Sequence, residues 1–407
     1  MEAIKTLVRH AYENVPYYRK LFRSIDLRPA DISSANDLRK IPILTKEVVQ
    51  KNYRDFIGTK NIARVHRTTG TSGKPLYIFY DMRDFDGYLI AKASALLKKF
   101  VGITKNDRIV NTFAYGLVQA GLEYDLAASK TGAMVIPTGT GLMAGHGKTL
   151  DAIVEFRPTA LFATPSYALR LGEIVEDSKL SSRKMKIERA MITGEPLTEA
   201  ARERIEEIWG AEVYNVWGMT EIGAGAGECS EHSGLHVMSD YIIPEVFRDG
   251  ATCQDGEGEL IVTTVGRYSM PLIRYNTRDI VKLSTKKCAC GSGYPRVTFC
   301  GVRSDNMLKI KGSPVYPVQI EQALYEIPQI GDYRIVLKSG KYGDYIAVEA
   351  ETRKEVSDIK KIKTDAEDGV AKKCGVKVNV KILKPGSLKK PDEWKTQKFF
   401  DLRRRSV

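Results

Sequence analysis

The segment 67–75 reads Arg-Thr-Thr-Gly-Thr-Ser-Gly-Lys-Pro, a composition suited to binding a polyphosphate. Its glycines let backbone N–H groups turn toward an anion, its hydroxyls add neutral donors, and Lys74 supplies a positive charge. A Walker A loop has serine or threonine after the lysine, whereas Lys74 is followed by Pro75. The loop therefore predicts a nucleotide site of another type, with a solvated hairpin turn as the alternative.

Four later motifs accompany this loop. They are Met191-Ile192-Thr193-Gly194-Glu195-Pro196, Asn215-Val216-Trp217-Gly218-Met219-Thr220-Glu221, Tyr275-Asn276-Thr277-Arg278-Asp279 and Gly301-Val302-Arg303-Ser304-Asp305. In order and spacing the set resembles the adenylate-forming enzymes of the acyl-CoA synthetase superfamily. It is most similar to the phenylacetate-CoA ligase branch, which includes coenzyme F390 synthetases. Segments 11–18 and 41–46 also resemble that branch, so the resemblance covers nearly the whole chain.

The resemblance implies that the first loop and the motif ending at Glu221 handle the phosphates of ATP. Thr220 would donate to the α-phosphate, and Glu221 would coordinate Mg2+, which prefers oxygen ligands. When a carboxylate attacks the α-phosphate and pyrophosphate leaves, charge develops on several oxygens, which magnesium and positioned donors must stabilise. The implied phosphate-binding residues are Thr68, Thr69, Gly70, Thr71, Ser72, Gly73 and Lys74.

The other motifs would bind the adenosine. Trp217 stands where the family usually has tyrosine, and its indole can stack on adenine or simply pack against the protein. Asp279 would accept hydrogen bonds from both ribose hydroxyls, and Asp305 would act as the hinge of a rotating small domain. The implied adenosine-binding residues are Gly194, Glu195, Pro196, Asn215, Trp217, Gly218, Asp279 and, near the hinge, Arg303.

Segment 395–403 resembles the one that carries the family's adenylation lysine, which implies a catalytic role for Lys395. An ammonium that bridges the substrate carboxylate and the α-phosphate would offset the repulsion between two anions. Trp394 stands where a glycine usually precedes this lysine, so Lys398 is the alternative.

The acyl pocket is expected in segment 113–118, with segment 164–167 nearby in the pattern. By resemblance to the aryl pocket of phenylacetate-CoA ligases, Phe113, Tyr115 and Val118 would contact the substrate. Phe113 and Val118 stand where relatives can have tyrosine and phenylalanine, which favours an apolar, roomy pocket. Ordinary core packing is the alternative for the same side chains.

Six cysteines are present, and four residues among the cysteines and histidines suggest a structural metal site. Cys288 and Cys290 have the form of one arm of a zinc knuckle, and Cys229 with His236 can supply the other arm. His232 is the competitor for the histidine position. Some relatives carry zinc here and others lack the Cys-x-Cys pair, so buried free thiols are the alternative.

The bulk properties are those of a globular cytoplasmic protein. A chain of 407 residues exceeds the usual limit for one core, so two or more domains are expected. We find no apolar run long enough for a membrane span and no apolar segment of a signal peptide at the N-terminus. The net charge of +13 is scattered along the chain, which favours attraction of ATP and coenzyme A over nucleic-acid binding.

Helical and β-rich segments alternate from residue 84 to residue 216, which predicts parallel β-α units, and strands dominate beyond Pro244. Residues 1–60 read as helices broken at prolines. We therefore expect an α/β fold with a large N-terminal adenylate-forming domain of mixed sheets and helices, residues 1–304, and a small mobile α+β lid domain, residues 305–407.

These observations predict an ATP-dependent ligase that forms an acyl-adenylate and transfers the acyl group to coenzyme A. The expected substrate is phenylacetate or a related aromatic acid, and the expected cofactors are ATP, Mg2+, coenzyme A and structural Zn2+. Partners would be small molecules, with no nucleic acid and no membrane, and a homodimer is compatible with the sequence. The alternatives are a coenzyme F390 synthetase-type adenylyltransferase that acts on a deazaflavin hydroxyl, and a non-catalytic nucleotide-binding protein.

Overall fold

The computed structural model describes residues 2–68, 75–141, 145–177, 186–304, 308–310, 313–340, 343–388 and 398–403. The chain clusters into two compact units: Met1–Leu197 with Ile205–Cys300, and Thr198–Arg204 with Gly301–Val407. The first is a large mixed α/β unit and the second a smaller α+β unit, so the predicted fold class is confirmed.

The large unit begins with short helices separated by prolines. Leu7, Ala11 and Val15 are fully buried, at a spacing of four residues that places them on one face of a helical stretch. Pro16 opens the second helix, where its missing N–H costs nothing. The elements are α1 (Glu2–Asn14), α2 (Pro16–Ser24), η1 (Pro29–Asp31), η2 (Asn36–Lys40), α3 (Lys46–Asn52) and η3 (Tyr53–Phe56).

This N-terminal segment is anchored to the strand that carries the Tyr275–Asp279 motif. Leu44 forms an isolated parallel bridge with Tyr275, exchanging backbone hydrogen bonds with Arg274 and Asn276. The Tyr18 hydroxyl donates to Pro271 O and accepts from Ile273 N. The segment is therefore part of the scaffold of that motif.

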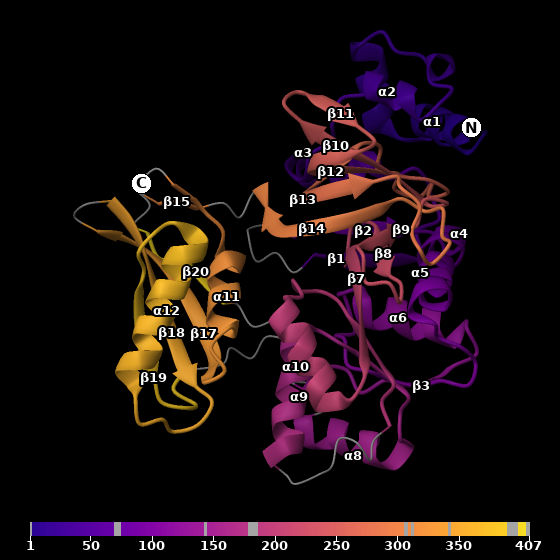
Figure 1. The fold of residues 1–407 in the computed structure, drawn as a ribbon. Helices are drawn as coiled ribbons and strands as arrows, with labels where there is room; N and C mark the ends of the chain where they lie inside the picture. Colours follow the sequence, from indigo (N-terminus) through magenta and orange to yellow (C-terminus); the bar gives the residue numbers. More distant parts are fainter. Residues whose placement is uncertain are drawn as a thin grey trace. The chain divides into compact units, whose positions relative to one another are not determined.

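Within the described residues, twelve strands form one sheet in the order β11-β10-β12-β13-β14-β9-β8-β7-β6-β5-β3-β4 (Figure 1). The parallel part comprises β3 (Arg108–Asn111), β4 (Met134–Ile136), β5 (Ala160–Ala163), β6 (Arg189–Ile192) and β7 (Glu212–Met219). The remaining strands are β8 (Gly223–Glu228), β9 (Leu235–Val237), β10 (Ile242–Arg248), β11 (Ala251–Cys253), β12 (Gly256–Thr264), β13 (Tyr275–Ser284) and β14 (Arg296–Arg303).

Helices connect the parallel strands, as the alternating pattern predicted. A long helical segment is continuous from residue 82 to residue 101, with η4 and η5 in the wider π form, and Gly102 ends it in the left-handed conformation. The helices are α4 (Met82–Asp84), η4 (Phe85–Ile90), α5 (Ala91–Leu96), η5 (Leu97–Val101), α6 (Ala120–Ser129), α8 (His146–Phe156), α9 (Pro165–Asp177) and α10 (Glu199–Trp209).

Strand β8 is buried along its whole length although its sequence, Gly-Ala-Gly-Ala-Gly-Glu, lacks the β-branched residues typical of strands. Its glycines leave room for large neighbours: a Cβ on Gly225 would lie 2.6 Å from the Trp217 ring, and one on Gly227 would lie 2.9 Å from Leu96. The strand was missed by sequence reasoning because its stability comes from these contacts.

The small unit has its own core. Tyr333, Ile335 and Leu337 alternate along β17, so they face one side of the sheet β19-β18-β17-β20, and they pack with buried residues of α11 and α12. The elements are β15 (Leu308–Ile310), β16 (Ser313–Val315), α11 (Pro317–Tyr325), β17 (Ile330–Gly340), β18 (Gly343–Thr352), α12 (Ile359–Cys374), β19 (Asn379–Leu383) and β20 (Phe399–Asp401). The hairpin β1 (Arg64–Arg67) and β2 (Tyr77–Tyr80) belongs to the large unit.

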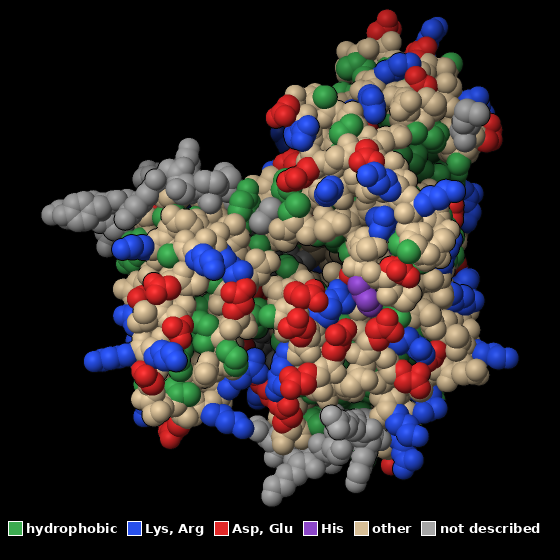
Figure 2. Space-filling model, in the orientation of Figure 1, with side chains coloured by type: hydrophobic (Ala, Val, Ile, Leu, Met, Phe, Trp, Pro, Cys, Tyr) green, Lys and Arg blue, Asp and Glu red, His purple; other side chains and the backbone are tan. Residues whose placement is uncertain are grey.

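Charged side chains are mixed over the visible face of the molecule. Figure 2 shows Lys and Arg interspersed with Asp and Glu on that face. In the part of the chain that the structure describes, every helix is too short or too polar to pass through a lipid bilayer.

Candidate functional site

The predicted motifs lie at the carboxyl ends of neighbouring parallel strands. Segment 113–118 follows β3, Thr164 follows β5, and Gly194 follows β6 by two residues. Strand β7 continues the row, with Asn215 paired to Ile192 of β6. Carboxyl ends of parallel strands meet at one edge of a sheet, where ligands of α/β proteins commonly bind. The fold therefore gathers the predicted acyl and adenine segments at one edge.

A carboxylate joins these two segments. Glu195 accepts hydrogen bonds from the Ser166 amide at 3.1 Å and from the Ser166 hydroxyl at 2.9 Å. Gly194 has a positive φ of 87°, a left-handed conformation that favours glycine. Gly194 and Pro196 are exposed, so this turn offers backbone and a small surface to a ligand.

Trp217 and Asp279 meet although β7 and β13 are not neighbours in the sheet. The indole Nε1–H donates to Asp279 Oδ2 at 3.3 Å, and Phe299 lies 5.3 Å from the indole between ring centroids. The Asp279 amide is held by the Thr277 hydroxyl. In the same motif, the Asn215 amide donates to Glu228, and a Cβ on Gly218 would lie 2.9 Å from Gly223 O. Two predicted adenosine residues are thus in direct contact.

Glu221 is a buried carboxylate, with its residue only 1% exposed. The Tyr275 hydroxyl donates to its Oε1 at 3.1 Å, and Lys46 Nζ lies 3.5 Å from the same oxygen. Its neighbour Thr220 is half-buried. A carboxylate offers the oxygen ligands that Mg2+ prefers, so the residue is chemically suited to bind this ion.

Several predicted residues lie outside the described residues. Of the phosphate loop, Thr68 is described: its hydroxyl accepts from the Leu76 amide at 2.9 Å and its amide donates to Leu76 O, which closes the base of the loop next to hairpin β1–β2. The residues outside the described ranges are Thr69, Gly70, Thr71, Ser72, Gly73, Lys74, Asp305 and Lys395. The half-buried Arg303 ends β14.

Lys398, the alternative to Lys395, packs within the small unit. Its ammonium contacts Glu321 at 3.3 Å and the Tyr325 hydroxyl at 2.9 Å, and lies 4.5 Å from the centroid of the Tyr333 ring. These contacts explain Lys398 as a structural residue of the small unit. Of the two lysines that the sequence offered for the catalytic role, they therefore favour Lys395.

The predicted acyl segment is well anchored. Phe113 is buried against Tyr124, with 5.3 Å between ring centroids. The Tyr115 hydroxyl donates to Asp125 at 2.8 Å and accepts from Asn111 at 2.9 Å, and burial together with Asp125 raises the Tyr115 pKa. Val118 is half-buried. The hydroxyl of Tyr115 is thus occupied by residues outside the segment, and Phe113 belongs to the core, as the alternative of ordinary packing would have it.

The four predicted metal ligands converge. The ligand atoms of Cys229, His236, Cys288 and Cys290 all lie within 4.8 Å of one another. The Cys229 and Cys288 sulfurs are 3.9 Å apart, and Cys290 Sγ lies 3.4 Å from His236 Nε2. Tetrahedral zinc with its usual bond lengths would separate two sulfurs by about 3.8 Å and a sulfur and a nitrogen by about 3.5 Å. The cluster fits a zinc ion.

His236 is oriented to bind a metal through Nε2. Its Nδ1 lies 3.3 Å from Tyr294 O, to which it would donate, and its ring stacks on Phe100 with 4.7 Å between centroids. Burial lowers the pKa of His236, which favours the neutral imidazole that metals require. His232, the competitor, instead contacts Glu212 and Glu228.

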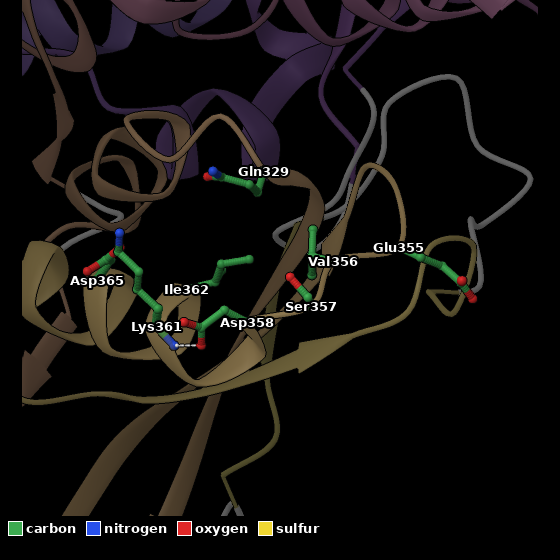
Figure 3. Close-up of a pocket in the computed structure, with 8 residues that line it drawn as sticks. All are labelled: Gln329, Glu355, Val356, Ser357, Asp358, Lys361, Ile362 and Asp365. Carbon is green, nitrogen blue, oxygen red and sulfur yellow. Dashed lines mark hydrogen bonds between the residues drawn. The ribbon is translucent and has the colours of Figure 1, made fainter.

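Two cavities lie apart from the nucleotide motifs. One, of about 560 Å3, is lined by residues that include Cys229, Cys290 and Phe100 beside the cysteine cluster. The other, of about 390 Å3, lies in the small unit before and along the first turns of α12 (Figure 3). Lys361, Asp358 and Asp365 give it a polar, largely exposed lining, and it includes none of the predicted site residues.

Sequence reasoning missed several residues that support the site. The sequence analysis covered the segments that contain Lys46, Ser166 and Tyr275 but assigned these residues no contact. It did not single out Lys92 or Arg267. Lys92 had a usable signal, since it is a single charge within the apolar helical run 88–97.

Comparison with known proteins relates the chain to one family. Residues 33–242 match the family described as "AMP-binding enzyme", and residues 312–403 match "AMP-binding enzyme C-terminal domain". The chain is 31% identical over 435 residues to a phenylacetate-coenzyme A ligase of Thermus thermophilus, covering 99% of this chain and 96% of that protein. It is 31% identical over 420 residues to the phenylacetate-coenzyme A ligase of Escherichia coli (strain K12), covering 99% of this chain and 94% of that protein.

A solved structure with the same fold is the 2-hydroxyisobutyryl-CoA ligase in the postadenylation state. It matches with a TM-score of 0.89 over 98% of this chain and 88% of that chain, at 23% identity. This similarity agrees with the division into a large and a small domain.

Proposed function

Because this chain belongs to the family of AMP-binding, adenylate-forming enzymes, we infer that it acts as an AMP-forming acid–CoA ligase. It uses ATP to convert a carboxylic acid into an acyl-adenylate, and coenzyme A then takes the acyl group to form a thioester. The observation that carries this function is the near full-length similarity to curated ligases, together with the Trp217–Asp279 and Glu221–Tyr275 contacts that bring separate motifs together.

We propose these roles for the described residues. Asp279 binds the ribose hydroxyls, with Trp217 beside it at the adenine, and the turn at Gly194 lines the adenine edge. Thr220 donates to the α-phosphate, and Glu221 holds the magnesium ion that neutralises developing phosphate charge. Lys395 and the segment Thr69–Lys74 retain their proposed roles at the reacting carboxylate and at the outer phosphates.

We propose that the substrate is phenylacetate or a related aromatic acid. Two observations support this substrate. The similar ligases are named for phenylacetate, and segment 113–118 is mostly apolar. Phe113 is buried against Tyr124, and the Tyr115 hydroxyl is occupied by Asp125 and Asn111. This wall presents little that would recognise a polar acyl chain.

We propose that Cys229, His236, Cys288 and Cys290 bind a structural zinc ion. Four protein ligands leave no position for a substrate, so the ion would stabilise the fold and take no part in the reaction. We also propose that the protein works in the cytoplasm on small molecules, without nucleic acid or membrane.

A pyrophosphate-exchange screen tests the function. Purified protein is incubated with ATP, Mg2+, pyrophosphate and an aromatic, aliphatic or deazaflavin substrate. Exchange between pyrophosphate and ATP should occur when the substrate is an aromatic acid. Addition of coenzyme A should then release AMP and consume coenzyme A in equal amounts. Exchange with a deazaflavin and no use of coenzyme A would favour a coenzyme F390 synthetase-type reaction instead.

A matched pair of variants separates catalysis from binding alone. Lys395→Ala should abolish exchange, whereas Lys398→Ala, which removes a lysine with structural partners, should retain it. Exchange that is unchanged in Lys395→Ala, or absent with every acid, would contradict the proposed chemistry.

A further inference from the structure

Beneath the turn that presents Thr220 and Glu221 lie three charged side chains with no place in the roles above. Lys92 and Arg267 are 0% exposed and Glu123 is 3% exposed. Burying a charge is costly unless the protein compensates it, and buried charges often serve specificity or function. Their contacts therefore need an explanation.

All three side chains bind the backbone that immediately follows Thr220. The Arg267 guanidinium donates through Nη1 to the carbonyl of Glu221, and the Lys92 ammonium donates to the carbonyl of Ile222. The Glu123 carboxylate accepts from the amide of Ala224 at 2.8 Å. Two successive carbonyls and one amide of the short segment 221–224 are thus held by buried side chains.

Each side chain is itself fixed in place. Lys92 Nζ lies 4.2 Å from the centroid of the Tyr88 ring, and the Arg267 guanidinium lies 4.7 Å from that of Tyr80. Gln119 donates to the other Glu123 oxygen at 2.9 Å. Arg267 keeps Nε and Nη2 without a hydrogen-bond partner among the described residues, a cost that fold stability alone does not explain.

The close approach of Glu123 requires a glycine. Gly223 has a positive φ of 74°, and a Cβ there would lie 2.6 Å from Glu123 Oε1 and 2.4 Å from Leu89. The sequence after Glu221 is thus adapted to the carboxylate beneath it.

We propose that Lys92, Glu123 and Arg267 form a buried cradle that positions the Thr220–Glu221 turn for the adenylation step. They are positioning residues, since each acts through the backbone and none would touch a substrate. The proposal rests on the proposed function, in which this turn engages the α-phosphate and magnesium. Magnesium and the departing pyrophosphate belong to adenylation, whereas the α-phosphate that Thr220 would bind is still present in the acyl-adenylate. The cradle should therefore matter more for adenylation than for transfer of a preformed acyl group to coenzyme A.

The test measures the two half-reactions separately. Adenylation is followed as pyrophosphate release from Mg-ATP and phenylacetate, or the acid that the exchange screen selects, without coenzyme A. Thioester formation is followed from the synthetic acyl-adenylate and coenzyme A. The variants are Arg267→Met and the double variant Lys92→Met with Glu123→Gln, which removes both charges and so avoids leaving one unpaired.

A buried ion pair elsewhere provides the control. Arg274 and Glu245 are also buried, with Nε and Oε2 3.2 Å apart, and neither contacts the turn through a described hydrogen bond. The double variant Arg274→Met with Glu245→Gln loses an equivalent pair of charges but none of the three hydrogen bonds to segment 221–224. Thermal unfolding shows whether each variant is folded. A further variant, Gly223→Ala, displaces Glu123 by steric contact and leaves all charges in place.

We expect the cradle variants to slow adenylation by about 100-fold, because a small misplacement of a reacting group has an effect of that size, and to slow thioester formation by less than about tenfold. The control should keep the wild-type ratio of the two rates. Equal slowing of both steps, or unimpaired adenylation, overturns the cradle. Wild-type protein that performs neither step overturns the proposed function instead.

Discussion

At the scale of single residues, the contact between Trp217 and Asp279 shows how an unusual side chain enters the site. Sequence comparison suggested stacking on adenine, and the indole also has a polar N–H that tyrosine would place differently. Here that N–H reaches Asp279 Oδ2 at 3.3 Å. A hydrogen bond to one carboxylate oxygen orients the other, so Trp217 should affect the ribose as well as the base.

Replacing Trp217 with phenylalanine tests this role. We expect Trp217→Phe to lower kcat/KM for ATP about five-fold, from the loss of about 1 kcal/mol of hydrogen bonding. The loss should shrink with 2′-deoxy-ATP or 3′-deoxy-ATP, because part of the ribose contact is already missing. Steady-state kinetics with the three nucleotides measures it. An equal loss with all three would mean that the indole acts through packing alone.

The sequence singled out candidate site residues but gave little information about their partners. Cys229, His236, Cys288 and Cys290 came from ligand type and spacing, and the structure brings them together. The convergence of Lys92, Glu123 and Arg267 could not be predicted, because they come from α5, from α6 and from the segment between β12 and β13 and meet only through tertiary packing.

At the scale of elements, the cysteine cluster joins segments that backbone pairing leaves loosely connected. Cys229 follows β8, His236 lies in β9, and Cys288 and Cys290 precede β14. The β9–β14 pairing described spans two residue pairs, His236 with Arg296 and Leu235 with Val297. A bound ion would therefore reinforce this part of the sheet.

Metal removal tests that reinforcement. Metal analysis should find about one zinc per chain, and a strong chelator should lower the melting temperature of the wild-type protein. Cys290→Ser should weaken zinc binding by at least about tenfold and lower the melting temperature in the absence of chelator. The exposed Cys253, outside the cluster, gives the matched control Cys253→Ser. A metal-free protein with the same stability would rule out the structural role.

Elements were predicted where local patterns were strong. The predicted alternation of helices and strands from residue 84 to residue 216 corresponds to observed elements. Strand β8 was missed because its glycines and alanines carry no strand signal, and the neighbours that stabilise it, Leu96 and Trp217, come from other elements.

At the scale of the whole molecule, each unit has a core of its own. Leu260 belongs to the core of the large unit and Leu337 to that of the small unit, and both are fully buried. Proteins built from separate cores commonly depart from two-state unfolding. The length of the chain predicted more than one domain because 407 residues exceed the usual limit for one core.

Leucine truncations test the independence of the two cores. Calorimetry should resolve two transitions, and each truncation should cost about 2–5 kcal/mol in its own unit. Leu337→Ala should lower the melting temperature of one transition, and Leu260→Ala that of the other. A single transition that both substitutions lower equally would show that the units unfold together.

The bond between Glu195 and Ser166 has a practical consequence for protein engineering. Attempts to redirect the enzyme to new acids would naturally randomise segment 164–167, which includes the first turn of α9. That segment is linked to the turn proposed to face the base, so libraries built there would trade selectivity against affinity for ATP. Retaining Ser166 while varying its neighbours would decouple the two traits.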